Sequence, residues 1–255
     1  MLKLSETKNV VHSVIRACRL LESFSHERPI LTLGELSSRA NLTKGTAHRL
    51  LSTLEVSGLV GRTPEGGYRL MPKLFRLGSI GIADLALRSI ARPIMLELAG
   101  RIGETSYLMV PSDVGALCVE RVDGSKPIRV MVMDIGTTLP YHTGAGPVVL
   151  LANRTELEGL LEEPLAPLTE KTHTDKTEIL ASLPKIRAQG FAESVDDVTI
   201  DVAAIGVPIR DGTNTVIAAL SVAGLKSHIL QDRDTIVEAL KQASATISHG
   251  LGATA

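Results

Sequence analysis

The side chains best suited to contact DNA gather in one short segment. The chain runs Lys44-Gly45-Thr46-Ala47-His48-Arg49 from residue 44, and a helix would bring its basic and hydroxyl groups to one face. Lysine and arginine can neutralise phosphates or donate to guanine edges, while threonine and histidine can reach base edges or the backbone. Gly45 costs a helix about 1 kcal/mol relative to alanine, which a close approach of the backbone to DNA would explain. We therefore predict a DNA-contacting surface made of Thr43, Lys44, Gly45, Thr46, His48, Arg49 and Ser52.

An apolar stripe on the opposite side should hold this helix, expected over residues 44–57, against a core. Ala47, Leu50, Leu51 and Leu54 follow the i, i+3, i+4, i+7 spacing of a buried helix face. The two stripes together predict a helix with one face in the protein and one face available to a partner.

Local signals place the ends of this helix and a shorter helix before it. Thr43 is suited to cap the long helix and Gly58 to end it. Thr32 stands three residues before Glu35, the spacing of a capping box, and predicts a helix over residues 33–40. A short helix, a tight turn and a longer helix with a basic face are typical of a helix-turn-helix, whose second helix enters the major groove.

A hairpin is expected directly after the helix-turn-helix. Residues 59–62 and 68–70 form two short apolar runs around a turn rich in proline and glycine. A hairpin in this place is the wing of a winged helix. Arg62 and Arg69 would lie on it and are expected to touch flanking phosphates or the minor groove.

The charge of the chain is divided unevenly. Residues 1–80 carry 12 Lys and Arg against 6 Asp and Glu, and the remainder carries 15 against 22, so that a net charge of +6 is followed by −7. A segment this basic is expected to meet a polyanion while the rest stays off it. The alternative, a small helical domain that binds no DNA, accounts less well for the +6 charge.

Hydrophobic periodicity predicts the remaining elements. An amphipathic helix is expected over residues 10–24, with Cys18 buried on its apolar side, and Pro72 should begin a helix whose apolar residues pair with a second copy of the chain. Further helices are expected at residues 90–102, 148–152, 180–189 and 232–251, and strands at 105–110, 116–121, 128–133, 203–210 and 216–222. Hairpin-linked strands with helices indicate an α+β domain with an antiparallel sheet.

Composition and spacing argue against several other kinds of protein. The first residues lack the apolar run of a signal peptide, and no apolar run approaches the roughly 20 residues of a membrane span. Cys18 and Cys118 have no metal or redox spacing. We therefore expect a cytoplasmic protein with no membrane partner and no cofactor.

Two alternatives concern the C-terminal part. His173-Thr174-Asp175 could serve an enzyme as a metal or acid-base site, but no third ligand, nucleophile elbow, P-loop or zinc signature accompanies it. We therefore expect no enzymatic activity. The other alternative is a DNA-binding regulator that has no ligand and uses this part only to form oligomers.

Several short motifs follow one another along nearly the whole chain. The N-terminal ones are LTLGEL at 31–36 and LTKGTAHRLLSTL at 42–54, followed by Gly58. The C-terminal ones are GET at 103–105, GTTLPYHTGAG at 136–146, AAIGVPI at 203–209 and AALSVAG at 218–224. In this order and spacing they resemble the IclR family of bacterial transcriptional regulators.

The resemblance implies an architecture and a function. It implies a winged helix-turn-helix domain over residues 1–70, a linker helix over 71–88 and a GAF-like effector-binding and oligomerisation domain over 89–255. Such proteins typically act as homodimers or homotetramers on palindromic double-stranded operators. The resemblance therefore implies a regulator, expected to be a repressor, whose operator binding is controlled by a small organic effector.

The resemblance also places the effector between the sheet and the loop over residues 143–146. Small residues in that loop leave backbone N–H groups free to face an anion, and a serine hydroxyl can donate to the same ligand; a tight turn into the helix at Pro147 is the alternative explanation of the glycines. Carried over by position, the effector-binding residues are Met131, Gly144, Ala145, Gly146, Ser194, Asp201, Ala204, Ser221 and Ala223.

This chain departs from the family pattern around that pocket. Pro147 stands where the family usually has Lys or Arg, Asp201 where it usually has Gly, and Ala204 and Ala223 where some members have Cys and Ser. The pocket should be less polar on its floor, with the carboxylate of Asp201 near its mouth. A carboxylate beside an anionic ligand is unfavourable unless it is paired. We therefore expect an aromatic or amide-bearing acid, or a neutral molecule, rather than a simple dicarboxylate.

Overall fold

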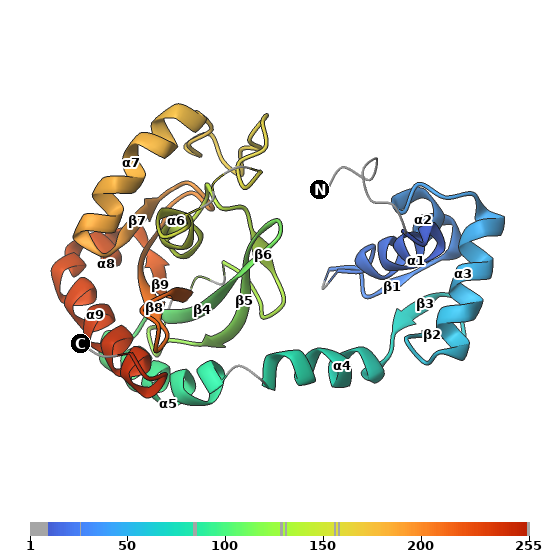
Figure 1. Ribbon diagram of the computed structural model, residues 1–255, viewed down its shortest axis with the longest axis horizontal. Coiled ribbons are helices and arrows are strands. Elements are labelled where there is room, and N and C mark those ends of the chain that lie inside the picture. The colour runs from blue at the N-terminus through green and yellow to red at the C-terminus, as the bar shows by residue number, and fades with distance from the viewer. Residues whose placement is uncertain are drawn as a thin grey trace. The chain divides into compact units, whose positions relative to one another are not determined.

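The computed structural model describes residues 10–25, 27–83, 86–127, 130, 132–155, 157 and 159–253. Its contacts divide the chain into two units, one up to residue 85 and one from residue 86 (Figure 1). Each unit has a hydrophobic core of its own, so each is described by itself.

The N-terminal unit combines helices with a small antiparallel sheet. Its strands pair in the order β1–β3–β2, with Ile30 opposite Arg69 and Arg62 opposite Tyr68. The predicted helix-turn-helix and hairpin are confirmed, and β1 is a strand that the sequence did not predict. The elements are α1 (His12–Glu22), β1 (Ile30–Leu31), α2 (Leu33–Arg39), α3 (Lys44–Val56), β2 (Val60–Arg62), β3 (Tyr68–Leu70) and α4 (Pro72–Ala83).

Helix caps in this unit follow the local sequence. The Thr32 hydroxyl accepts the Glu35 N–H at 3.3 Å and the Glu35 carboxylate accepts the Thr32 N–H at 2.8 Å, which confirms the capping box. The hydrogen bonds from the backbone and hydroxyl of Thr32 lower the pKa of Glu35. The Thr43 hydroxyl accepts the Thr46 N–H at 3.3 Å and caps α3, as predicted.

One expectation for α1 is wrong. Cys18 is exposed, whereas burial was predicted. The apolar side of α1 is wider than the face that the rest of the unit covers: Leu20 is buried, but Val11 and Val14 are exposed.

The C-terminal unit is built on a six-stranded antiparallel sheet in the order β6–β5–β4–β9–β8–β7. Figure 1 shows α6 inside the curve of this sheet and α5 with α9 along its outer side. The predicted α+β class is confirmed. The elements are α5 (Ala86–Ile102), β4 (Thr105–Ser112), β5 (Gly115–Val122), β6 (Thr138–Leu139), α6 (Ala145–Ala152), α7 (Lys176–Gln189), β7 (Ala192–Val195), β8 (Val202–Arg210), β9 (Val216–Leu225), α8 (Lys226–Gln231) and α9 (Arg233–Gly250).

Several details of this unit differ from the sequence-based expectation. The strand predicted over residues 128–133 is wrong, because residues 130, 132 and 133 lie in no strand; residues 128, 129 and 131 lie outside the described residues. The apolar side chains of this stretch pack against the core rather than alternate across a sheet, since Val132 and Met133 belong to the core cluster. β6, β7 and α8 were not predicted, because β6 and β7 are short and α8 has only six residues.

Candidate DNA-binding surface and effector cavity

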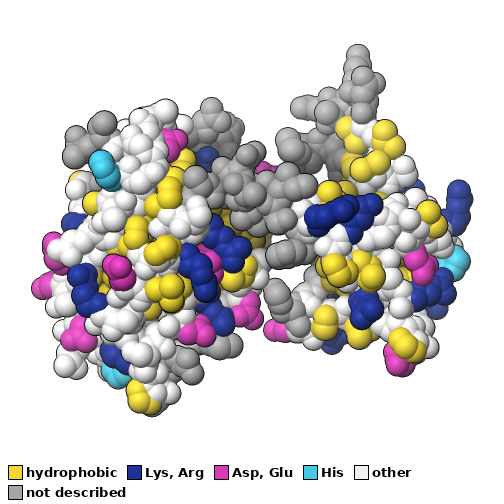
Figure 2. All heavy atoms as spheres, turned by 90° about the horizontal axis from the view of Figure 1, so that it is seen from below, with side chains coloured by type: hydrophobic (Ala, Val, Ile, Leu, Met, Phe, Trp, Pro, Cys, Tyr) yellow, Lys and Arg dark blue, Asp and Glu magenta, His cyan; other side chains and the backbone are white. Residues whose placement is uncertain are grey.

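Helix α3 presents a basic face away from the core of the N-terminal unit. Ala47, Leu51 and Leu54 are buried, whereas Lys44, His48 and Arg49 are exposed, as is Gly45. In Figure 2, Lys and Arg side chains and a histidine line the outer edge of this unit where α3 lies. The predicted division of α3 into two faces is therefore present in the structure.

The hydroxyl side chains of this surface are engaged with the helix itself. The Thr43 hydroxyl donates to the Thr46 hydroxyl at 3.0 Å, and the Ser52 hydroxyl donates to the His48 carbonyl at 3.0 Å. Thr43 is exposed, while Thr46 and Ser52 are half-buried. These hydroxyl groups therefore stabilise α3 at its N-terminal end and along its exposed face.

The two basic side chains of the hairpin differ in their surroundings. Arg62 folds back toward α3: its guanidinium lies 3.4 Å from the Glu55 carboxylate, 3.5 Å from Nε2 of His48 and 5.2 Å from the centre of the Tyr68 ring. Arg69 is exposed on β3. In the part of the chain that the structure describes, no carboxylate pairs with Lys44, Arg49 or Arg69, so their charges are available to a polyanion.

In the C-terminal unit, a cavity lies between α6 and the sheet. Backbone contacts bring α6 onto the strands: a Cβ on Gly206 of β8 would lie 2.9 Å from the carbonyl carbon of Ala145. The lining brings together Gly144, Ala145, Gly146, Ser194, Ala204, Ser221 and Ala223, which were predicted from the resemblance. It also includes Tyr107, Met109, Val132, Met133, Leu139, Pro147, Asp197, Val198, Thr199, Val202 and Ala203.

The cavity offers polar groups in a mainly apolar lining. Ser221 is 5% exposed and, among the residues that the structure describes, its hydroxyl has no hydrogen-bond partner. The N–H groups of Ala145 and Gly146 lie in the first turn of α6, where a helix supplies no acceptor. Few directed polar groups within an apolar wall are typical of a small-molecule site.

A buried carboxylate that the sequence did not point to also lines the cavity. Asp197 is 6% exposed; it accepts the Gly144 N–H at 2.8 Å and the Ser194 hydroxyl. Gly144 has φ +74°, which favours glycine at the turn that aims this N–H at Asp197. Asp197 lies 53 residues from Gly144, and no spacing signal connects the two.

The position of Asp201 corrects the expectation of a carboxylate at the mouth of the pocket. Its side chain is 78% exposed, lies 3.3 Å from Lys226 Nζ and does not line the cavity. Its φ of +64° explains why glycine suits this position, since aspartate is one of the few other residues that tolerate the left-handed region. Met131, also predicted for the site, lies outside the described residues.

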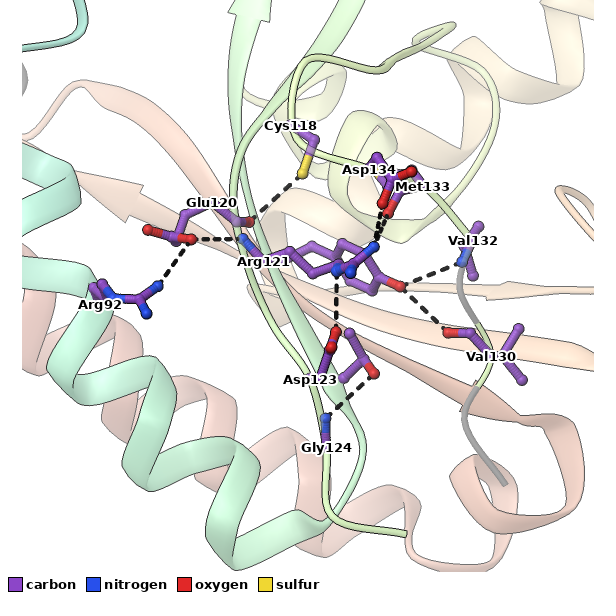
Figure 3. Close-up of polar contacts among 12 residues, drawn as sticks. Arg92, Cys118, Glu120, Arg121, Asp123, Gly124, Val130, Val132, Met133 and Asp134 are labelled. Atoms are coloured by element: carbon purple, nitrogen blue, oxygen red, sulfur yellow. Dashed lines mark hydrogen bonds and ion pairs between the residues drawn. The ribbon is translucent and has the colours of Figure 1, made fainter. Parts of the chain in front are cut away.

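The segment after β5 is tied to the wall of the cavity. The Tyr107 hydroxyl donates to the Val130 carbonyl at 3.4 Å and accepts the Val132 N–H at 3.3 Å. Figure 3 shows Arg121 directed toward Asp123, Asp134 and the Met133 carbonyl. Burial raises the pKa of Tyr107, which keeps the phenol protonated and able to donate.

Residues 173–175, the alternative enzymatic site, have a structural role at the start of α7. The Asp175 carboxylate accepts the N–H groups of Thr177 at 2.7 Å and Glu178 at 3.2 Å, so it is the N-cap of α7, and His173 is exposed. Within the described ranges, no group of three or more His, Cys, Asp or Glu side chains could hold a metal ion. Burial raises the pKa of Cys118 to about 12, so its thiol is unreactive.

Comparisons with known proteins agree with this geometry. The IclR helix-turn-helix domain matches residues 13–64, and the bacterial transcriptional regulator IclR C-terminal model matches residues 81–249. The HTH-type transcriptional regulator KipR of Bacillus subtilis is 30% identical over 251 residues, 97% of this chain and 100% of KipR. The transcriptional repressor IclR of Escherichia coli is 28% identical over 251 residues, 94% of this chain and 90% of the repressor.

A solved structure extends the comparison to the whole fold. An IclR homolog from Microbacterium hydrocarbonoxydans, complexed with 4-hydroxybenzoate, is 29% identical and superposes with a TM-score of 0.81, covering 94% of this chain and 98% of that one.

A winged helix-turn-helix followed by a curved sheet that carries a mainly apolar cavity defines a DNA-binding regulator with a ligand domain. The chain belongs to the IclR family of bacterial transcriptional regulators. It is a transcriptional regulator with an effector-binding C-terminal domain, and its relatives are regulators rather than enzymes. None of the helices in the described part of the chain is both long and apolar enough to cross a membrane.

Proposed function

We propose that α3 enters the major groove of a double-stranded operator and that the β2–β3 hairpin contacts the adjacent backbone. The observation that carries this proposal is the division of α3 into a buried apolar face and an exposed face with Lys44, His48 and Arg49. These residue types supply phosphate and base-edge contacts. The proposed DNA-binding residues are Thr43, Lys44, Gly45, Thr46, His48, Arg49, Ser52, Arg62 and Arg69.

We propose further that a small organic effector, an acid or an amide-bearing catabolite, binds in the α6 cavity and controls operator binding. The unpartnered Ser221 hydroxyl and the N–H groups of Ala145 and Gly146 support this, because each would be satisfied by a ligand oxygen. Binding would shift a pre-existing equilibrium between arrangements of paired recognition helices. The relative complexed with 4-hydroxybenzoate shows that a homologous protein takes an aromatic acid.

The proposed assembly is a homodimer or homotetramer that works as a repressor in the cytoplasm. Residues 1–70 would bind DNA, 71–88 would link, and 89–255 would hold the effector and form oligomers. A second copy supplies a second α3, so that two half-sites lie about 34 Å or a multiple apart. Repression is supported by the relative from Escherichia coli, which is a repressor.

Footprinting on the DNA upstream of the protein's own gene tests the proposal. We expect a protected site with two-fold symmetry, and an effector should change the protein concentration at which half of this DNA is protected. Uniform binding, equal to that on unrelated DNA of the same length, would contradict a sequence-specific regulator.

Replacing Gly45 separates the stability of α3 from its proposed role on DNA. A Cβ at Gly45 meets no heavy atom within 4 Å, so the fold itself does not require glycine there. We expect Gly45→Ala to raise the free energy of unfolding by up to about 1 kcal/mol and to weaken operator binding, measured by urea unfolding and fluorescence anisotropy. Gly34→Ala on α2 is the matched control, because its Cβ would also have room, with Thr32 Oγ1 at 3.9 Å. Unchanged operator affinity in the stabilised Gly45→Ala variant would show that DNA does not approach this face closely.

A further inference from the structure

The carboxylate of Asp197 occupies the place in the cavity where an anionic ligand would be expected. It accepts the N–H of Gly144, the N-cap residue of α6, at 2.8 Å, and it accepts the Ser194 hydroxyl. The N-terminal end of a helix attracts a negative charge. In this protein the chain itself supplies that charge, and two of the donors in the predicted site are already used.

The surroundings of Asp197 do not offset a second negative charge. Among the described residues that line the cavity there is no Lys, Arg or His. Lys226 pairs with Asp196, the residue before Asp197 in the chain, at 2.8 Å and with Asp201 at 3.3 Å, and neither carboxylate lines the cavity. A ligand carboxylate would therefore lie in a poorly solvated space beside Asp197 without a cation.

The polar groups that remain call for both a donor and an acceptor on the ligand. The N–H groups of Ala145 and Gly146 can donate to a ligand oxygen. The unpartnered Ser221 hydroxyl lies across from them on β9, where a Cβ on Gly146 would come within 3.5 Å of its oxygen. The oxygens of Asp197 retain lone pairs that can accept an N–H or an O–H. A carboxylate has only acceptors, whereas a primary amide has a carbonyl oxygen and an NH₂ group.

The rest of the lining is apolar and favours an apolar body. Met109, Met133, Leu139 and Val198 face the cavity, and Ala204 and Ala223 add small apolar surfaces. The cavity thus combines an apolar lining with a few polar groups, which come from the start of α6, from β9 and from Asp197 after β7.

We propose that Asp197 makes this cavity select an uncharged ligand, with an apolar body and a group that combines a carbonyl oxygen with an N–H or O–H donor, over the matching carboxylate. A primary amide is the simplest such group. This inference rests on the proposed function of the cavity as the effector site and assigns that effector's chemical class.

Matched pairs of probes test the inference on the full-length protein. Isothermal titration calorimetry would compare 4-hydroxybenzamide with 4-hydroxybenzoate, and benzamide with benzoate, on the wild type and on Asp197→Asn. We expect the wild type to bind the amide of a pair at least 10-fold more tightly than the acid. Asp197→Asn should reduce this ratio at least 10-fold, because it removes the negative charge and keeps an oxygen for the Gly144 N–H. Asp113→Asn is the control, since Asp113 carries the same charge but is exposed in the turn between β4 and β5 and does not line the cavity, and it should leave the ratio unchanged.

Three results would overturn the inference: equal or tighter binding of the acids by the wild type, an equal change of the ratio in both variants, or no binding of any probe by either the wild type or Asp197→Asn. Thermal unfolding of each variant checks that it folds. If an acid binds tightly and alters the operator footprint, the proposed function stands and only the ligand class assigned here is wrong. If the footprint shows no specific site, the proposed function fails whichever probe binds.

Discussion

Removing Lys44 and Arg49 together is expected to weaken operator binding about 100-fold or more. Each side chain is exposed on α3 and has no carboxylate partner in the described part of the chain, so both are free to contact phosphates or guanine edges. A hydrogen bond to a charged group contributes about 1.5–3 kcal/mol, and two such contacts correspond to at least two orders of magnitude. Anisotropy titrations of Lys44→Ala/Arg49→Ala on the footprinted site would measure the decrease in affinity.

The dependence on salt distinguishes phosphate contacts from base contacts. Removing a side chain that neutralises one phosphate should reduce the slope of log affinity against log salt by about 0.9. If Lys44 and Arg49 both contact phosphates, the slope falls by nearly two per protomer; if Arg49 contacts a base, the slope falls by half as much and the sequence preference changes. Lys185→Ala on α7 removes an exposed charge from the other unit and should leave both quantities unchanged. If the double variant bound the operator as tightly as the wild type, the DNA would have to contact a surface other than this face of α3.

The caps and the two faces of α3 could be predicted from the sequence because their causes are local. The caps Thr32 and Thr43, the stripe of Ala47, Leu51 and Leu54, and the basic opposite face all arise within one or two helical turns. Local patterns are less reliable for short apolar runs, which can pack against a core without forming a strand. Such a run predicted a strand at residues 128–133, although Val132 and Met133 pack against the core and line the cavity instead.

The cavity could be predicted in part, and only through the family resemblance. Gly144, Ser194, Ala204, Ser221 and Ala223 do come together, although 79 residues separate the first from the last. Asp197 and Asp201 show what position alone could not resolve. They are four residues apart, but Asp197 points into the cavity while the turn at Asp201 directs its side chain to Lys226 and to solvent. That difference depends on the backbone between β7 and β8, which spacing does not specify.

Replacing Arg88 and Arg92 together is expected to destabilise the C-terminal unit by about 2–3 kcal/mol. Glu120 of β5 is 1% exposed; it lies 2.8 Å from Arg88 and 3.1 Å from Arg92, both on α5. Figure 3 shows Arg92 reaching the Glu120 carboxylate from the helix. Breaking a buried ion pair on one side costs about 3–5 kcal/mol. We expect a cost at or below the lower end of this range, because the two arginine side chains are 42% and 52% exposed and the Arg121 N–H still donates to Glu120.

A double-mutant design shows whether the decrease in stability comes from the carboxylate. Urea unfolding, followed by circular dichroism, would compare the wild type with Arg88→Gln/Arg92→Gln and with the same variant carrying Glu120→Gln. The third change should recover most of the stability, since it removes the unpaired charge. Arg101 on the same helix donates to the exposed Gln242 at 3.3 Å, so the control Arg101→Gln should change the free energy of unfolding by less than about 0.5 kcal/mol. A triple variant less stable than the double one would show that packing, not charge, explains the destabilisation.

The pH dependence of the same variants has a definite sign. Burial by itself would raise the pKa of Glu120, but the hydrogen bonds from Arg88 and the Arg121 N–H and the charges of both arginines outweigh it and hold this pKa below the usual 4.5. In the wild type, Glu120 therefore stabilises the fold above about pH 4.5, and this contribution is lost as the pH falls through its lowered pKa. Without the arginines, burial dominates and the pKa of Glu120 should rise above its unfolded value. As the pH falls, Glu120 is then protonated in the variant before it is protonated in the wild type, and this removes the unpaired buried charge that destabilises the variant. The difference in stability between the wild type and Arg88→Gln/Arg92→Gln should narrow as the pH is lowered from 7 toward 4.5; a difference that stays constant would mean that Glu120 is not what the two arginines stabilise.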